Sequence, residues 1–197
     1  MNSQENLWSG DFGNTYTSRQ KLDLLSTRVF FRKALKEAKL TNPGILEFGA
    51  GKGHNLRALR RIYEGATVSG VEINPDAFKE LEIVAHHATL GSVLDPNPVG
   101  RWDLVFTKGL LIHIHPDYLQ AAYQTIFDCS KRYILICEYF NQTPVAIEYH
   151  GEKDALWKRD FAGDMLDKFP LKVLDYGFTW KRDKYPQDDI TWALLSK

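Results

Sequence analysis

Three glycines at alternate positions and two acidic residues point most directly to chemistry in this sequence. The glycines are Gly49, Gly51 and Gly53; Glu47 precedes them by two residues, and Glu72 ends the next apolar run. Because glycine has no Cβ, a glycine turn lets a ligand approach the main chain closely. Glu72 would stand beside that turn, where a carboxylate can accept both hydroxyls of a ribose. The combination predicts a site for an adenosine moiety; the alternative is a tight turn without a ligand.

The spacing of the glycines separates two kinds of nucleotide site. Nicotinamide and flavin proteins carry G-x-G-x-x-G between a strand and a helix. Here the run is G-x-G-x-G, and His54 stands where the last glycine of that pattern would be. The spacing therefore argues against an oxidoreductase. With Glu47, the run E-x-G-x-G-x-G resembles motif I of the class I methyltransferases that use S-adenosylmethionine. The resemblance implies that Glu47 helps to hold the methionine amino group, directly or through water.

The elements that would position these residues alternate between strands and helices. The glycine turn would follow a buried strand at 44–48, and Glu72 would end a strand at 67–72. This alternation predicts a parallel sheet covered by helices. We expect the last two strands to form an antiparallel hairpin because no helix separates them. The other periodic segments predict helices at 18–40, 55–63, 75–87 and 116–128, and strands at 88–90, 102–107, 133–138, 171–180 and 190–196.

The family resemblance extends over most of the chain and implies its architecture. It implies a single Rossmann-like α/β domain over residues 1–197, with a seven-stranded, mostly parallel sheet, an antiparallel C-terminal strand and helices on both faces. Residues 1–17 would form an N-terminal lid or arm, and 141–164 an irregular insertion on the acceptor side. Within the superfamily, residues 8–19, 148–151 and 159–161 are similar to methylases associated with pseudaminic acid biosynthesis.

The cofactor site that the resemblance implies draws on the glycine turn, the acidic loop, the adenine loop and strand four. In many members an acid contacts the adenine amino group where this chain has Ser92. At the N-terminus, aromatic residues lie among glycines, and we expect no helix there but either a lid over the cofactor or an arm packed on the core. The lid would place Tyr16 near the methionine moiety and Arg19 on its carboxylate. The remaining implied cofactor residues are Glu47, Gly49, Ala50, Gly51, Gly53, Glu72, Ile73, Ser92, Val93 and Thr107.

His113 is the leading candidate for acceptor chemistry. It follows strand four, at the edge where open α/β sheets bind their ligands. A histidine has a pKa near working pH and can remove a proton from a hydroxyl; alternatively, His113 packs or caps the next helix. A polar and aromatic wall, which suits a sugar, is expected from the substrate-binding candidates Glu138, Tyr139, Tyr149, His150 and Asp160.

Composition narrows the classes of partner. The 197 residues are 44% hydrophobic, enough for one large core, and the formal net charge is zero. A neutral chain has no global field to attract nucleic acid or an anionic membrane. No apolar segment is long enough to span a bilayer, and no signal peptide is recognisable, so we expect a cytoplasmic protein. Cys129 and Cys137 are expected to be buried thiols.

These observations predict transfer of a methyl group from S-adenosylmethionine to a small-molecule acceptor, with S-adenosylhomocysteine as the product and no metal. The expected acceptor is a hydroxyl of a sugar or nucleotide sugar. Two alternatives remain open: a non-catalytic module that binds S-adenosylmethionine, and methylation of an amine or carboxylate of another metabolite. The sequence is compatible with a monomer or a homodimer.

Overall fold

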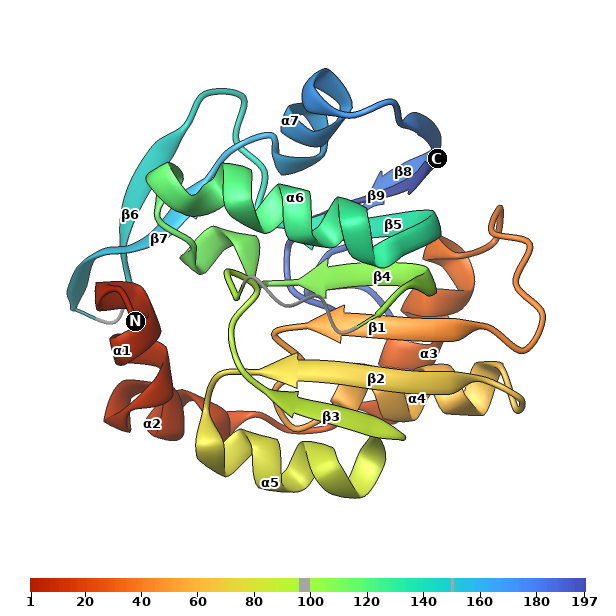
Figure 1. Cartoon of the computed structure of the whole chain (residues 1–197), viewed down its shortest axis with the longest axis horizontal. Coiled ribbons are helices and arrows are strands. Elements are labelled where there is room, and N and C mark those ends of the chain that lie inside the picture. The colour runs from red at the N-terminus through yellow and green to blue at the C-terminus, as the bar shows by residue number, and fades with distance from the viewer. Residues whose placement is uncertain (96–99, 150) are drawn as a thin grey trace.

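A seven-stranded mixed sheet organises the computed structural model, which describes residues 1–95, 100–149 and 151–197, with backbone alone for 152–154. The strand order is β3-β2-β1-β4-β5-β9-β8 (Figure 1). Neighbours from β3 to β5 are parallel, and β9 is antiparallel to both β5 and β8. This confirms the expected class I methyltransferase fold. The strands are β1 (Gly44–Phe48), β2 (Thr67–Glu72), β3 (His87–Leu90), β4 (Trp102–Lys108), β5 (Ser130–Glu138), β8 (Lys172–Phe178) and β9 (Thr191–Ser196).

The register of the central strands brings the glycine turn and the acidic loop together. Phe48 of β1 lies opposite Val71 of β2, so the residues that follow each strand emerge side by side. Both strands are buried over nearly their whole length, as expected of parallel strands covered on both faces. The carboxyl ends of β1, β2 and β4 therefore form one edge, at the left of Figure 1.

Helices cover both faces of the sheet. On one face, α3 (Leu24–Ala34), α4 (His54–Ile62) and α5 (Pro75–Val84) pack through Phe31, Leu59 and Leu81. On the other face lie α6 (Leu119–Cys129) and α7 (Phe161–Lys168), together with the 3₁₀ turn η1 (Leu111–His113). A second 3₁₀ turn, η2 (Pro116–Tyr118), leads into α6. Cys129 and Cys137 are buried thiols in these two cores, as expected.

The N-terminal segment is helical, so the expectation of no helix there was wrong. It forms α1 (Ser3–Ser9) and α2 (Asp11–Arg19). A capping box begins α1: the Asn2 side chain accepts from Glu5 N, and the Glu5 carboxylate accepts from Asn2 N. The long helix predicted at 18–40 is also shorter, because Asp23 caps a new helix by accepting from Ser26 N.

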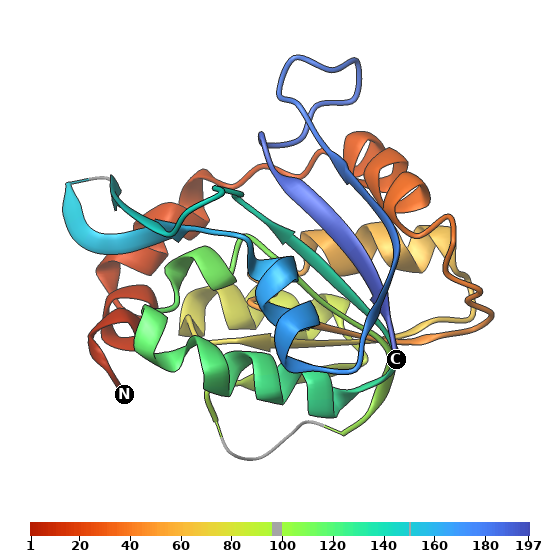
Figure 2. The same ribbon diagram turned by 90° about the horizontal axis from the view of Figure 1, so that it is seen from above.

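The segment 141–164 is also more regular than expected. It contains an antiparallel hairpin of β6 (Val145–Tyr149) and β7 (Glu152–Lys158), followed by the start of α7. Asp160 begins α7 by accepting from Gly163 N at 2.8 Å. The hairpin and the α1–α2 pair both lie at the carboxyl-end edge of the sheet (Figures 1 and 2).

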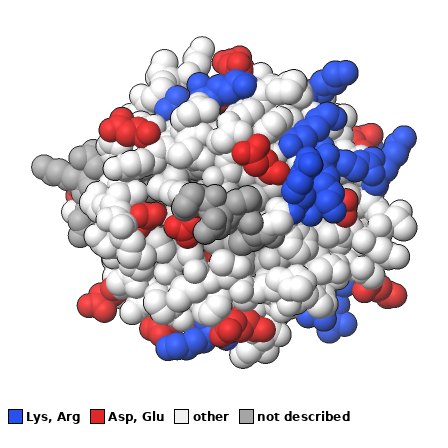
Figure 3. Space-filling view, in the orientation of Figure 1, with Lys and Arg blue, Asp and Glu red and all other residues white. Residues whose placement is uncertain are grey.

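Basic side chains gather at the opposite end of the sheet. Figure 3 shows the largest group of them at the upper right of the displayed face, where β4 and β5 begin. At that end, Arg101 Nη2 and Lys197 Nζ both donate to the Ser130 carbonyl. Among the described residues, no helix combines the length and apolar character needed to cross a bilayer.

Candidate functional site

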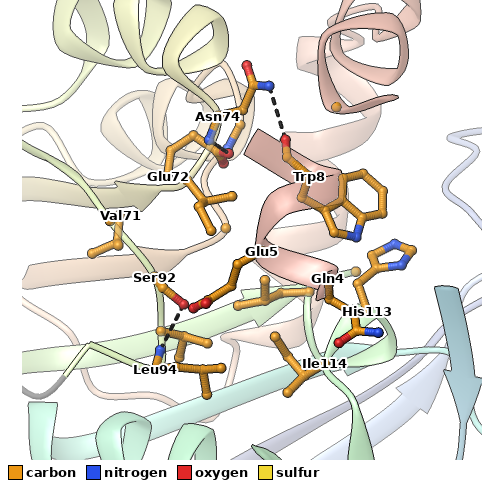
Figure 4. Close-up of a pocket in the computed structure, with 18 of the residues that line it drawn as sticks. Gln4, Glu5, Trp8, Val71, Glu72, Asn74, Ser92, Leu94, His113 and Ile114 are labelled. Atoms are coloured by element: carbon orange, nitrogen blue, oxygen red, sulfur yellow. Dashed lines mark hydrogen bonds between the residues drawn. The ribbon is translucent and has the colours of Figure 1, made fainter. Parts of the chain in front are cut away.

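A cavity lies at the carboxyl-end edge of the sheet, beneath α1 and α2 (Figure 4). Counted with its open mouth, it encloses about 920 Å³. Its floor comes from the turn after β1, the acidic loop after β2 and the loop after β3. Its roof comes from the N-terminal helices, and its far wall from the turn after β4. Representative lining residues are Gly51, Glu72, Ser92, Leu110 and Trp8.

Positive φ angles shape the turn after β1. Gly49 has φ 69° and Gly51 has φ 51°, a left-handed conformation that glycine adopts without a steric penalty. A Cβ on Gly49 would come within 2.9 Å of the Leu110 side chain, so the turn also needs glycine for packing. Gly49 N and Ala50 N donate to Val71 O, which locks the turn onto β2. The exposed main chain of Gly51 forms part of the cavity wall.

Glu72 is held in the cavity wall by backbone donors. Its Oε2 accepts from Gly51 N at 2.7 Å and its Oε1 from Asn74 N at 2.8 Å. Burial raises the pKa of the carboxyl group, and these N–H groups oppose the rise. A carboxylate has about four acceptor positions, so two hydrogen bonds leave capacity for two ligand hydroxyls.

Glu47 lies behind the cavity wall. The residue is fully buried, and Asn55 Nδ2 donates to its Oε1 at 2.6 Å. Burial raises the pKa of Glu47 to about 8, against the hydrogen bond from Asn55 and the charge of Lys108. Its Oε2 has no hydrogen-bond partner within the part of the chain described. An unsatisfied buried oxygen of this kind fits a missing cationic or N–H donor.

The predicted cofactor residues fall into two groups. Seven line the cavity: Tyr16, Gly49, Gly51, Glu72, Ile73, Ser92 and Val93. The main chain of Ser92 donates to the Asp95 carboxylate, and its hydroxyl accepts from Leu94 N. The remaining five do not line the cavity: Glu47, Ala50, Gly53 and Thr107 are buried behind it, and Arg19 is exposed at the end of α2.

His113 is part of the cavity wall, and the residue is 6% exposed. Nδ1 lies 2.9 Å from the Ala155 carbonyl of β7, so Nδ1 carries the hydrogen and Nε2 is left as an acceptor. Burial lowers the pKa of His113 to about 4, so the expectation of a pKa near working pH was wrong; the imidazole is neutral at neutral pH and is a weaker base than an exposed histidine. The centroid of the Trp8 ring lies 4.2 Å from that of the His113 ring (Figure 4), and the centroid of the Tyr149 ring lies 5.4 Å from it.

The predicted substrate residues are spread over two places. Tyr149 joins the aromatic group around His113, with Phe12 of α2 at 6.4 Å between ring centroids. Tyr139 is contacted by the Lys158 ammonium, 5.1 Å from its ring centroid. Glu138 and Asp160 line a second hollow between α7 and β8, which we call the α7 groove. His150 lies outside the described residues.

Glu138 has a structural role that its sequence position did not reveal. Its carboxylate accepts from Leu110 N and Leu111 N at 3.1 Å and from Ile112 N at 3.4 Å. Burial raises the pKa of Glu138 to about 7, and these N–H groups oppose the rise. The carboxylate therefore holds in place the turn that carries His113.

Sequence analysis missed several residues of the site. Trp8 was expected only as one aromatic residue of a lid or arm, yet its ring packs on His113. Asn74 caps α5 by accepting from Ala77 N, and its Nδ2 donates to Trp8 O and to Asn14 Oδ1. An Asn directly before Pro75 is a recognisable helix start and could have indicated this role. Lys108 and Leu110 also line the cavity.

Sequence comparison decides the family. The sequence profile of a methyltransferase domain matches residues 18–178, most of the chain. The chain belongs to this methyltransferase domain family. No functionally curated protein gives a significant match to it. Within the described part of this methyltransferase, no group of three or more His, Cys, Asp or Glu side chains is arranged to hold a metal ion.

Solved structures share the fold of this methyltransferase at low sequence identity. Magnesium protoporphyrin IX methyltransferase from Synechocystis PCC 6803, with bound SAM, has a TM-score of 0.72 at 10% identity, covering 100% of this chain and 98% of that chain. A second structure is the 1,6-didemethyltoxoflavin-N1-methyltransferase of Burkholderia thailandensis with bound S-adenosylhomocysteine. Its TM-score is 0.70 at 14% identity, covering 98% of this chain and 86% of that chain. Mitomycin 7-O-methyltransferase has a TM-score of 0.69 at 13% identity, covering 100% of this chain and 61% of that chain.

Proposed function

We propose that this methyltransferase binds S-adenosylmethionine in the cavity beneath α1 and α2 and transfers its methyl group to a hydroxyl of a small molecule. The acceptor class that we propose is a sugar or a nucleotide sugar. One observation carries the proposal: a single cavity brings together the glycine turn, the Glu72 carboxylate and the His113 ring. The choice of a sugar rests on the resemblance of residues 8–19 and 159–161 to methylases associated with pseudaminic acid biosynthesis.

The cavity residues fit the cofactor by their chemistry. Glu72 would accept the ribose hydroxyls, and the main chain at Gly49 and Gly51 would let the methionine part approach closely. Glu47 would contribute negative charge behind the wall, where its Oε2 lacks a donor from the described residues. The sulfonium supplies an activated methyl group, so the protein's task is to orient the reactants and exclude water. Orientation can contribute on the order of 7–11 kcal/mol.

The aromatic group around His113 supports a small acceptor. Trp8, Phe12 and Tyr149 offer flat apolar surfaces, which suit the face of a sugar ring. Trp8 Nε1 is buried and has no hydrogen-bond partner among the described residues, so a hydroxyl of the acceptor would satisfy it. His113 Nε2, left as an acceptor by the contact at Nδ1, would take the hydroxyl proton.

Two segments would complete the acceptor side. Residues 1–17, which contain α1 and most of α2, would act as a lid over the cofactor. Residues 141–164, which contain the β6–β7 hairpin, would wall the acceptor pocket, because Tyr149 and the Ala155 carbonyl both contact His113. Methylation of an amine is the second candidate, since aromatic rings also bind cations.

The cofactor proposal is tested by calorimetric titration with S-adenosylhomocysteine in the presence of a chelator. Glu72→Ala should lower the affinity about 10- to 150-fold, the effect of losing about 1.5–3 kcal/mol of hydrogen bonding to a charged group. Glu82→Ala, which removes an exposed acid from α5, is the control. Unaltered binding by Glu72→Ala would overturn the ribose contact, and no binding by the wild type would overturn the cofactor.

The acceptor proposal is tested by screening nucleotide sugars and free sugars with labelled S-adenosylmethionine. With the best acceptor, His113→Ala should lower turnover about 10²–10⁴-fold and leave cofactor affinity nearly unchanged, because only proton removal is lost. His87→Ala is the control, since His87 is exposed at the start of β3. Activity confined to amines or carboxylates would overturn the sugar acceptor. Near-normal turnover in His113→Ala would show that His113 packs in the wall and does not remove the proton.

A further inference from the structure

Asn74 lies at the junction between the acidic loop after β2 and the α1–α2 pair. The residue is 2% exposed and follows Glu72 by two positions. Its main-chain N–H donates to Glu72 Oε1 at 2.8 Å, and its side chain donates to Trp8 O of α1 (Figure 4). The same side chain also donates to Asn14 Oδ1 of α2. One buried residue therefore contacts the carboxylate proposed to bind the ribose and both helices that roof the cavity.

The side-chain amide of Asn74 is fixed in orientation by its partners on both sides. Its Oδ1 accepts from Asp76 N at 3.1 Å and from Ala77 N at 2.9 Å, at the start of α5. Its Nδ2 donates to Trp8 O at 3.1 Å and to Asn14 Oδ1 at 2.8 Å. Both hydrogens of the NH₂ group are used, and a flipped amide would place that group against two N–H donors. The start of α5 therefore directs the Asn74 donors at α1 and α2.

Gly13 allows the two helices to meet at this junction. A Cβ on Gly13 would lie 1.9 Å from Trp8 O and 2.9 Å from Asn74 Nδ2, the two atoms that the hydrogen bond joins. A side chain at position 13 would therefore displace the acceptor and the donor together. The close packing of α1 on α2 and the hydrogen bond from Asn74 depend on the same glycine.

We propose that Asn74 is a positioning residue that couples occupancy of the cofactor site to closure of the lid, residues 1–17. This coupling rests on the proposed function, because it needs a cofactor beside Glu72. Residues of the lid and of the acidic loop line the same cavity, so a cofactor bound there contacts both. It therefore binds the arrangement in which Asn74 joins them better than one in which the lid is open.

The coupling acts in both directions and reaches the acceptor side. Because linkage is reciprocal, a lid that the cofactor holds closed also raises the affinity for the cofactor. Trp8, whose carbonyl accepts from Asn74, packs its ring on His113. Closure of the lid over the cofactor therefore also sets the aromatic wall in front of His113.

Hydrogen exchange of the full chain, followed by mass spectrometry with and without saturating S-adenosylhomocysteine, tests the coupling. In the wild type, the ligand should slow exchange in residues 3–17 at least about tenfold. Asn74→Ser retains an oxygen that can cap α5 and the main-chain N–H to Glu72, but it loses the NH₂ group that reaches the lid. In this variant, unliganded exchange in residues 3–17 should be about tenfold faster and the affinity for S-adenosylhomocysteine about tenfold lower, while exchange in β4 and β5 stays at the wild-type rate.

Two further variants separate the coupling from a general loss of helix stability. Asn14→Ala removes the α2 acceptor and should change exchange and affinity in the same direction as Asn74→Ser. Alanine has a higher helix propensity than asparagine, so faster exchange in this variant cannot come from a weaker α2. Asn6→Ala, at an exposed asparagine of α1, is the matched control and should leave both quantities unchanged.

The outcomes distinguish this coupling from the proposed function. If the wild type binds S-adenosylhomocysteine but residues 3–17 gain no protection, the coupling is overturned and the cofactor stands. Wild-type exchange and affinity in Asn74→Ser would also overturn the coupling, as would exchange that quickens equally in β4 and β5, because Asn74 would then only cap α5. A wild type that does not bind S-adenosylhomocysteine would overturn the proposed cofactor and the coupling together.

Discussion

At the scale of single residues, the buried carboxyl group of Glu47 makes the stability of the fold depend on pH. Glu47 has a native pKa of about 8 against an ordinary value of 4.5. Between these values the folded state holds a proton that the unfolded state has released, so stability falls as pH rises from about 4.5 through 8. A cationic ligand next to Glu47 would stabilise its charged carboxylate and so offset this loss of stability.

Glu47→Gln should therefore stabilise the unliganded protein at alkaline pH. The amide resembles the protonated acid and cannot ionise, so we expect a gain of at least about 1 kcal/mol at pH 8 and a much smaller change at pH 5. Urea unfolding at the two pH values measures the difference. Glu64→Gln, at an exposed acid, should show no such pH dependence. A Gln variant that is equally destabilised at both pH values would contradict the raised pKa.

Residue spacing predicted only part of the site. The pairing of Glu72 with the glycine turn followed from two strand ends, because adjacent parallel strands end at the same edge. The hydrogen-bond partners of Glu138 could not be predicted from spacing, since these contacts depend on how the chain bends after β4. His113 was found by its position, but its low pKa comes from burial beneath Trp8 and β7, which no local pattern reveals.

At the scale of elements, α1 and α2 show why the N-terminal prediction failed. Helices this short are marginal in isolation, and Gly13 lowers the propensity of α2 further. They are stabilised by tertiary contacts, such as Asn74 Nδ2 with Trp8 O and the Trp8 ring with His113. The β6–β7 hairpin was missed although Val145, Ile147 and Tyr149 alternate along β6, because this strand is largely exposed and its alternation does not mark a face in the core.

Deleting residues 1–16 should weaken cofactor binding more than it weakens the fold. These helices roof the cavity but contribute no strand to the sheet, and lids belong to the less stable parts of a fold. We expect affinity for S-adenosylhomocysteine to fall at least about tenfold, a loss of about 1.4 kcal/mol, while the unliganded melting temperature changes by only a few degrees. Titration and thermal unfolding of the same preparation compare the two. If the unliganded melting temperature falls as strongly as the affinity for S-adenosylhomocysteine, the segment is a structural part of the fold and not a lid.

At the scale of the whole molecule, the sheet was the most predictable feature. Alternating apolar segments identified all seven of its strands, because buried parallel strands such as β5 are continuously apolar. The family resemblance implied the antiparallel C-terminal strand, but the full lateral order was not predicted, since strand pairing depends on contacts remote in sequence. The α7 groove was not predicted for the same reason.

Saturating S-adenosylhomocysteine should stabilise the whole domain. At about 100 times the dissociation constant, a ligand that binds only the native state adds about 2.7 kcal/mol, or about 5–10 °C for a chain of this size. Differential scanning calorimetry measures the shift. The same shift should persist with a chelator, and loss of the shift on chelation would reveal a metal requirement.

The central position of β9 has a consequence during synthesis. On the ribosome, β9 emerges after every other strand, yet it belongs between β5 and β8. Until it arrives, β5 has an unpaired edge and β8 has no neighbour in the sheet. Unpaired strand edges in nascent chains are prone to aggregation, so the sheet is most exposed to aggregation in the interval before β9 is in place.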